Sequence, residues 1–256
     1  MEYTSPLQPA ETGRLDGIAW CLWLPDEAIA PQHADPVPAV IILHGAGSRK
    51  ENHADFARAA TAYGFAALTF DNRGHGETEG DLGASVIDDL GALARMLAER
   101  PEIDGERIAV RGSSMGGLMA LHLGASSASV HAVVVICPAA EWMIAEDVQR
   151  VADGKQAREG SALREMRIDA RSLLEWLDSN DVERAAERLG SKPLMLVHAR
   201  GDEVVPPSNS ERLYEIAGEP KRLLILEGGD HRSAQHDSEV QGETLTWLSR
   251  ALGGSR

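Results

Sequence analysis

A serine between two glycines carries the most specific chemistry in this sequence. Gly112, Ser114 and Gly116 form a Gly-x-Ser-x-Gly pattern between an apolar run at 107–110 and a helix-forming stretch at 118–123. A sharp turn from strand to helix needs small residues on both sides of the serine, and it places the hydroxyl at a helix N-terminus, where free N–H groups favour negative charge. Ser114 is therefore the predicted nucleophile. The alternative is a plain turn in which a serine caps the helix.

A serine hydroxyl is a weak nucleophile at neutral pH, so it needs a histidine base within hydrogen-bond reach. His231 follows the last predicted strand in a loop that begins with two glycines, and it is the predicted base. His236, a few residues further on, is the alternative base. His198 lies before the predicted acid, which is the wrong order for the base in this architecture.

The base in turn needs a carboxylate that orients its ring. Asp202 directly follows Gly201, which allows a sharp turn at the end of an apolar run, and it is the predicted acid. Glu203 and Asp230 are nearby competitors for this role. Without a catalytic role, Asp202 would be an ordinary turn-forming aspartate.

Two backbone N–H groups are expected to hold the negatively charged oxygen that forms during attack on a carbonyl. One is predicted to come from Met115, the residue after the nucleophile. The other is predicted to come from Ala46, in the loop that follows a strongly apolar run. His44, at the start of that loop, is expected to brace it and to border the substrate pocket.

The elements that must position these residues alternate along the chain. Apolar runs typical of strands are separated by stretches with helical spacing, which predicts a mostly parallel sheet covered by helices on both faces. Such sheets bind ligands at the carboxyl ends of their strands, where all these motifs fall. The predicted strands are 14–24, 39–43, 65–70, 107–110, 130–137, 193–198 and 222–226, and the predicted helices are 53–63, 85–100, 118–123, 207–217 and 236–252.

Two segments near the N-terminus are expected to differ from this parallel pattern. The strand at 14–24 should pair in an antiparallel hairpin with a segment before Thr12. The proline-rich stretch 26–38 is predicted to be a surface linker between strands.

A long helical insertion at 139–191 interrupts the alternation. About a dozen residues suffice for a crossover between parallel strands, so this segment is predicted to add a small cap to a core formed by 1–138 and 192–256. Trp142, Met143 and Trp176 are the predicted lining of an acyl pocket beneath this cap. The alternative is a set of amphipathic helices that cover the rim of the sheet.

Composition limits the class of protein and its partners. The chain has 256 residues, 43% hydrophobic, and a net charge of −15, which argues against binding to nucleic acid and to anionic membranes. The N-terminus lacks the pattern of a signal peptide, so a cytoplasmic protein is expected. Cys21 and Cys137 are predicted to be buried free thiols. The expected partner is a small-molecule ester, and the candidate assembly is a homodimer.

Five motifs in order resemble those of the α/β-hydrolase superfamily, and most closely its bacterial serine esterase, acylpeptidase and dienelactone-hydrolase-like branch. The resemblance implies an eight-stranded, mainly parallel sheet with a helical cap, a serine acyl-enzyme mechanism and no cofactor. Ser114 distinguishes the chain from dienelactone hydrolases, which use cysteine, and from dehalogenases, which use aspartate. The motifs are 44–48, 71–76, 112–117, 201–206 and 229–231.

The sequence therefore predicts a hydrolase of carboxylic esters with small to medium acyl groups and with no metal. The same residues would also serve a thioesterase or a serine peptidase of the acylaminoacyl type. The alternative from another class is a binding protein with this fold that has lost catalysis, which an intact set of Ser114, Asp202 and His231 argues against.

Overall fold

Eight strands form one sheet in the computed structural model, which describes residues 8–25 and 36–253 of the chain. Their order across the sheet is β1-β2-β4-β3-β5-β6-β7-β8, with antiparallel pairing of β2 to β1 and to β4 and parallel pairing elsewhere. This arrangement confirms the predicted fold. The strands are β1 (Glu11–Leu15), β2 (Ile18–Trp23), β3 (Val37–Leu43), β4 (Ala66–Phe70), β5 (Ile103–Ser113), β6 (Ala132–Ile136), β7 (Leu194–Ala199) and β8 (Lys221–Leu226).

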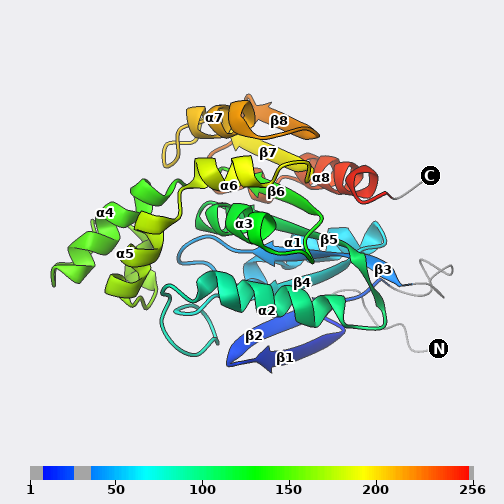
Figure 1. Cartoon of the computed structure of the whole chain (residues 1–256), viewed down its shortest axis with the longest axis horizontal. Helices are drawn as coiled ribbons and strands as arrows, with labels where there is room; N and C mark the ends of the chain where they lie inside the picture. The colour runs from blue at the N-terminus through cyan, green and yellow to red at the C-terminus, as the bar shows by residue number, and fades with distance from the viewer. Residues whose placement is uncertain (1–7, 26–35, 254–256) are drawn as a thin grey trace.

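Helices cover both faces of this sheet (Figure 1). α2, α3 and α6 pack on one face, and α1 and α8 pack on the other. In the described part of the chain, no helix combines the length and the apolar character that a membrane crossing requires. The helices are α1 (Ala54–Ala62), α2 (Val86–Ala98), α3 (Met115–Ser126), α4 (Glu141–Ala152), α5 (Ala170–Ser179), α6 (Val182–Arg188), α7 (Ser208–Ile216) and α8 (Ser238–Ala251), with short 3-10 turns η1 (Lys50–His53), η2 (Ala162–Glu165) and η3 (Ser233–Gln235).

The central strands are buried on both faces, which explains their unbroken apolar sequences. Every residue of β4, β6 and β7 is buried. Because a parallel strand between two helical layers has no solvent-facing side, Val and Ile are favoured at successive positions. Each such buried side chain stabilises the fold by about 1.5–3 kcal/mol relative to its exposed state.

The N-terminal hairpin differs from the prediction in its turn. Residues 14–24 were expected to form one strand, but the chain reverses at Asp16 and Gly17, which have φ angles of 48° and 82°. Positive φ at two successive residues is the geometry of a tight hairpin turn, which aspartate and glycine tolerate. Residues before this turn therefore belong to β1 and residues after it to β2.

The predicted linker at 26–38 ends earlier than expected. β3 begins at Val37 and includes Pro38, and the register of its pairing with β5 shifts between Val37 and Ala39. A proline lacks the N–H that a regular ladder uses, so it sits at this irregularity. The rest of the predicted linker, residues 26–35, lies outside the described residues.

The insertion at 139–191 divides into two parts. α4 and α5 pack against each other beyond one end of the sheet, whereas α6, which the sequence did not predict, packs on α3 (Figure 1). Between α4 and α5 the chain runs beside the loop after β4, through a bridge from Ile168 to Leu82 and a hydrogen bond from the Arg167 amide to the Gly74 carbonyl. The insertion thus contacts the loop after β4, at the carboxyl edge of the sheet.

Candidate active site

Ser114 occupies a strained turn between β5 and α3. Its φ and ψ angles are 55° and −122°, a region that residues with a side chain rarely adopt. Hydrogen bonds hold the turn on both sides: the Ser114 amide donates to the Ile136 carbonyl at 3.0 Å, and its carbonyl accepts from the Ala139 amide at 3.0 Å. The main chain of the neighbouring strand thereby fixes the serine at the start of α3.

The glycines of this turn are required by close backbone contacts. A Cβ atom added at Gly112 would lie 2.0 Å from the carbonyl oxygen of Gly116. A Cβ atom added at Gly116 would lie 2.4 Å from the carbonyl oxygen of Leu43, at the end of β3. The turn can therefore pack this closely against β3 only without side chains at these two positions.

His231 and Asp202 form a pair beside this turn. The His231 Nδ1 atom lies 2.7 Å from Oδ2 of Asp202, whose side chain is 0% exposed. The other oxygen, Oδ1, accepts hydrogen bonds of 2.8 Å from the amides of Val204 and Val205. Burial alone would raise the pKa of Asp202, but the hydrogen bonds from His198, His231 and Val205 outweigh it and hold this pKa far below its usual range. Asp202 is therefore a carboxylate.

The competitors for these two positions are placed differently. His236, the alternative base, lies 2.8 Å from Asp55 of α1, and both side chains are more than a third exposed. Asp230 accepts hydrogen bonds from the amides of its own turn, and Glu203 points into solvent. Of the two candidate bases His231 and His236, only His231 has a fully buried carboxylate as its partner.

One cavity of about 570 Å³ brings the predicted residues together. Ser114, His231, Ala46 and Met115 all line it. In the described chain, no hydrogen bond joins the Ser114 hydroxyl to the His231 ring. Such contacts are often long without substrate and shorten in the reacting complex.

The loop after β3 is held by buried histidines. The His44 Nδ1–H donates to the Gly45 carbonyl at 2.8 Å, and its Nε2 accepts from the Asn72 amide at 3.0 Å. His75 accepts from the amide of Gly47 at 3.2 Å. Burial lowers the pKa of His44 to about 4, which keeps the ring neutral and able to accept this bond. His44 thus braces the loop from behind and does not line the cavity.

Of the three pocket residues predicted in the insertion, one lines the cavity and two do not. Met143 lines the cavity, with Ile144 and Leu163 beside it. Its neighbour Trp142 is 63% exposed and lies outside the lining. Trp176 packs edge-on against His122 of α3, with 5.2 Å between ring centroids, and is 8% exposed. Successive helical residues point about 100° apart, so neighbours in sequence reach different surroundings.

Arg111 anchors the loop that carries His231, and sequence reasoning missed this contact. Its guanidinium is buried, lies 3.9 Å from the ring centre of Phe56, and donates to the Gln235 carbonyl at 2.7 Å. The adjacent Ser113 donates its hydroxyl to the Gln235 side chain. Burial lowers the pKa of Arg111 to about 10, which leaves it charged at neutral pH. An arginine within an apolar strand is the sequence signal that could have pointed to such a role.

A second cluster lies behind the pair, where Cys137, His198 and Asp202 bring potential metal-binding atoms within 4.8 Å of one another. Both cysteines are free; Cys137 is buried as predicted, whereas Cys21 is only half-buried. Burial raises the pKa of the Cys137 thiol to about 12, so it stays protonated at neutral pH. The thiol of this cluster is therefore uncharged, and its carboxylate, Asp202, is the same one that pairs with His231.

The sheet order, the strained serine turn and the site at the carboxyl ends of the strands are those of an α/β-hydrolase. A family model described as serine aminopeptidase, S33, matches residues 34–186, which is more than half of the chain. The chain therefore belongs to this family of serine hydrolases.

Individual relatives agree with this assignment. The putative esterase YitV of Bacillus subtilis is 26% identical over 215 residues, which cover 77% of this chain and 83% of that protein. The uncharacterized protein YfhR of Escherichia coli O157:H7 is 26% identical over 93% of this chain and 78% of its own length. The crystal structure of the α/β-hydrolase GrgF from Penicillium sp. sh18 matches with a TM-score of 0.73 at 22% identity, over 94% of this chain and 98% of that one.

Proposed function

We propose that the protein cleaves carboxylic esters of small to medium acyl groups through a covalent acyl-serine intermediate. One observation carries the proposal. Ser114, held in a strained turn, and His231, bonded to the buried carboxylate of Asp202, line the same cavity. A nucleophile, a base and an orienting acid are the minimum set for this reaction.

The reaction follows from the roles of these three groups. The Ser114 Oγ attacks the ester carbonyl while its proton passes to Nε2 of His231, and Asp202 stabilises the charged ring through Nδ1–H. The carbon–oxygen bond to the alcohol then breaks, and the alcohol leaves with the proton from His231. Water attacks the acyl-serine with His231 as its base, which releases the carboxylic acid and restores the hydroxyl.

The amides of Ala46 and Met115 are the proposed donors to the oxygen that becomes negative during attack. Both residues line the cavity on the serine side. Met115 begins α3, so its N–H has no partner within the helix and is supported by the helix dipole. Removal of one such donor from a related site typically costs a factor of about 10²–10³ in rate.

The insertion at 139–191 is the proposed cap of the site, on a core formed by 1–138 and 192–256. Met143, Ile144 and Leu163 supply apolar surface to the cavity. Asp147 and Arg158 also line it, and their ion pair of 2.8 Å joins α4 to the segment that follows it. An apolar wall with few polar groups suits an acyl chain.

Peptidase activity is the second candidate, because the family that matches is described as serine aminopeptidases. The same residues could attack an amide, whose amine would leave with the proton from His231. An ester screen and an anilide screen on one preparation decide between the two.

A hydrolysis screen tests the proposal directly. Purified protein is assayed with p-nitrophenyl esters from acetyl to palmitoyl, with a thioester and aminoacyl anilides alongside, and is labelled with a fluorophosphonate probe. We expect preferred turnover of short and medium esters and one label on Ser114. Ser114→Ala should lower kcat by about 10⁶-fold and abolish labelling, at an unchanged melting temperature. Hydrolysis that survives this substitution would refute the assignment.

A further inference from the structure

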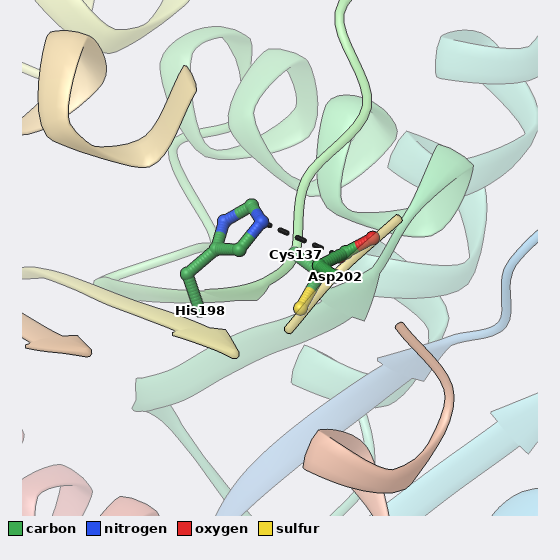
Figure 2. Close-up of side chains that lie close together, drawn as sticks. All are labelled: Cys137, His198 and Asp202. Carbon is green, nitrogen blue, oxygen red and sulfur yellow. Dashed lines mark ion pairs between the residues drawn. The ribbon is translucent and has the colours of Figure 1, made fainter. Parts of the chain in front are cut away.

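The carboxylate of Asp202 has a second histidine neighbour, which the proposed reaction does not use. The His198 Nε2 atom lies 3.3 Å from Oδ2, the same oxygen that contacts His231, and both side chains are 0% exposed (Figure 2). His198 is the penultimate residue of β7 and precedes the turn that holds Asp202. Asp202 is thus enclosed by one ring on the cavity side and another within the protein.

The hydrogen-bond partners of His198 fix the position of its proton. Its Nε2 also lies 3.0 Å from the Val205 carbonyl, which can only accept, so Nε2 carries the hydrogen. Its Nδ1 lies 2.7 Å from the hydroxyl of Ser210, a fully buried residue of α7, and accepts that proton. The ring therefore directs an N–H group at the region between the Val205 carbonyl and the Asp202 carboxylate.

This N–H adds a second contact to Oδ2, from the side of the carboxylate opposite the cavity. The amides of Val204 and Val205 hold Oδ1, which fixes one oxygen but leaves the plane of the carboxylate free to turn about it. A donor at Oδ2 fixes the second oxygen and with it the direction of the lone pair that faces His231. An oxygen with two lone pairs can accept from both rings at once.

A bound metal ion is the other interpretation of this cluster, since Cys137 completes a set of three potential ligands (Figure 2). Each of the three potential ligand atoms already carries a proton or accepts a hydrogen bond, however. The His198 Nε2 donates to Val205, the Asp202 Oδ2 accepts from His231, and the Cys137 thiol is protonated at neutral pH. A metal would have to displace two protons, one from His198 and one from Cys137, and break the Asp202–His231 contact.

We propose that His198 is a positioning residue that orients the Asp202 carboxylate toward His231. The proposal rests on the proposed function, because it assigns Asp202 a part in catalysis. Its distinguishing feature is geometric: the Nε2 side of the ring matters for the reaction, whereas the Nδ1 side serves the packing of β7 against α7.

Three substitutions of His198 separate these two sides. Glutamine places an amide N–H near the position of Nε2, asparagine places its polar atoms near Nδ1, and phenylalanine removes both. We expect His198→Phe and His198→Asn to lower kcat by about 10–100-fold with little change in KM, and His198→Gln to recover most of the rate. Recovery by asparagine and not by glutamine, or an unchanged rate in all three, would overturn the proposal.

A pH profile distinguishes positioning from general damage to the fold. Loss of the Nε2 donor leaves more negative charge on the oxygen that faces His231 and favours the protonated state of the coupled Asp202–His231 pair, so the acid limb of kcat/KM should move to higher pH in the phenylalanine variant and return in the glutamine variant. His122→Phe is the matched control, because His122 is a buried histidine that packs on Trp176, away from the cavity. It should leave both the rate and the pH profile unchanged. An unmoved acid limb in His198→Phe contradicts the proposal.

Two further readouts keep the possible failures apart. A wild-type protein without hydrolysis or fluorophosphonate labelling refutes the proposed function, whereas an active wild type with a fully active His198→Phe variant refutes only the role of His198. Zinc is then added to the wild type and to Cys137→Ser. Inhibition that the cysteine substitution abolishes would make the cluster a metal site and overturn the proposal; an equal response in both supports the hydrogen-bonded arrangement.

Discussion

The two sides of the cavity differ in how tightly the backbone constrains them. On the sheet side, a Cβ atom at Gly112 would lie 2.0 Å from a carbonyl oxygen, and one at Gly116 would lie 2.4 Å from another. On the insertion side, Gly160 has nothing within 4 Å of the corresponding position. The geometry of the reacting groups is therefore fixed by main-chain contacts, while the surface opposite them can change without disturbing those groups.

The charged groups of the two sides differ in the same way. Asp202 is enclosed and fully buried, with both oxygens engaged. Arg158, across the cavity, is 49% exposed and shared between Asp147 and Glu146. Because solvent reaches the Arg158 guanidinium, this arrangement contributes less energy than a fully buried pair, although the Asp147 side chain is only 8% exposed. The contrast suggests that the sheet side determines the reaction and the insertion side determines the substrate.

Asp202→Asn should produce the largest difference in kcat between a substitution on the sheet side and one on the insertion side. An amide cannot support the charged His231 ring and favours the wrong tautomer, so kcat should fall by about 10⁴-fold. Arg158→Gln, the removal of a charge from the insertion side, is the matched comparison and should change kcat by less than about threefold. Steady-state assays with one short ester measure both. An equal loss of kcat in the two variants would mean that the insertion side contributes as much to catalysis as the sheet side.

A pair of glycine substitutions tests the backbone contrast. Gly112→Ala should destabilise the protein by about 3 kcal/mol, because its Cβ atom overlaps the carbonyl of Gly116. Gly160→Ala has open space but a φ of +77°, so it should cost only about 1 kcal/mol. Urea unfolding of both variants gives the two free energies. A smaller loss at Gly112 than at Gly160 would contradict the contrast.

The buried histidines of the sheet side predict how stability depends on pH. Burial lowers the pKa of His44 to about 4 and that of His53 to about 3. Below about pH 6.5 the unfolded chain binds protons that the folded protein excludes, so each histidine should reduce the free energy of unfolding by about 1.4 kcal/mol per pH unit down to about pH 4. Urea unfolding between pH 7 and pH 4 measures this slope. His53→Phe should make this slope smaller. An unchanged slope would show that His53 does not contribute to the pH dependence of stability.

The smallest effect is expected from two neighbouring residues of α4. Met143→Ala should lower kcat/KM for medium-chain esters by about tenfold and leave acetate esters nearly unchanged, because Met143 lines the cavity. Trp142→Ala should change neither, since this side chain is 63% exposed and lies outside the lining. Acyl-length profiles of both variants provide the measurement. A stronger effect at Trp142 would mean that the insertion rearranges over the substrate.

The sequence predicted the fold and the positions of the site residues well where local patterns determine them. The turn around Ser114 and the placement of Asp202 and His231 at strand ends follow from spacing and from chain order, which the sheet then brings to one edge. Their catalytic roles remain predictions. The hairpin at Asp16 was misplaced because the Asp16-Gly17 pair, a typical sequence for such a two-residue turn, was assigned to the middle of a strand.

Contacts between distant segments could not be predicted in this way. Helical spacing marks one face of α4 as apolar, but which of Trp142 and Met143 meets the cavity depends on how α4 packs against α5. The partner of Arg111 is a main-chain carbonyl, which has no sequence signature at all. The same holds for His198, whose position was judged by its order in the chain rather than by its neighbours.

The Arg111–Gln235 contact also has a consequence for the order of folding. It spans 124 positions and joins the strand before Ser114 to the loop that carries His231. Contacts of such long sequence separation are slow to form, because a large loop must close first. During synthesis, the Ser114 turn leaves the ribosome before the loop of His231 does, so the proposed nucleophile is made before the proposed base. The proposed hydrolytic activity should therefore appear only after this loop has packed on β5, which makes activity a sensitive reporter of that contact.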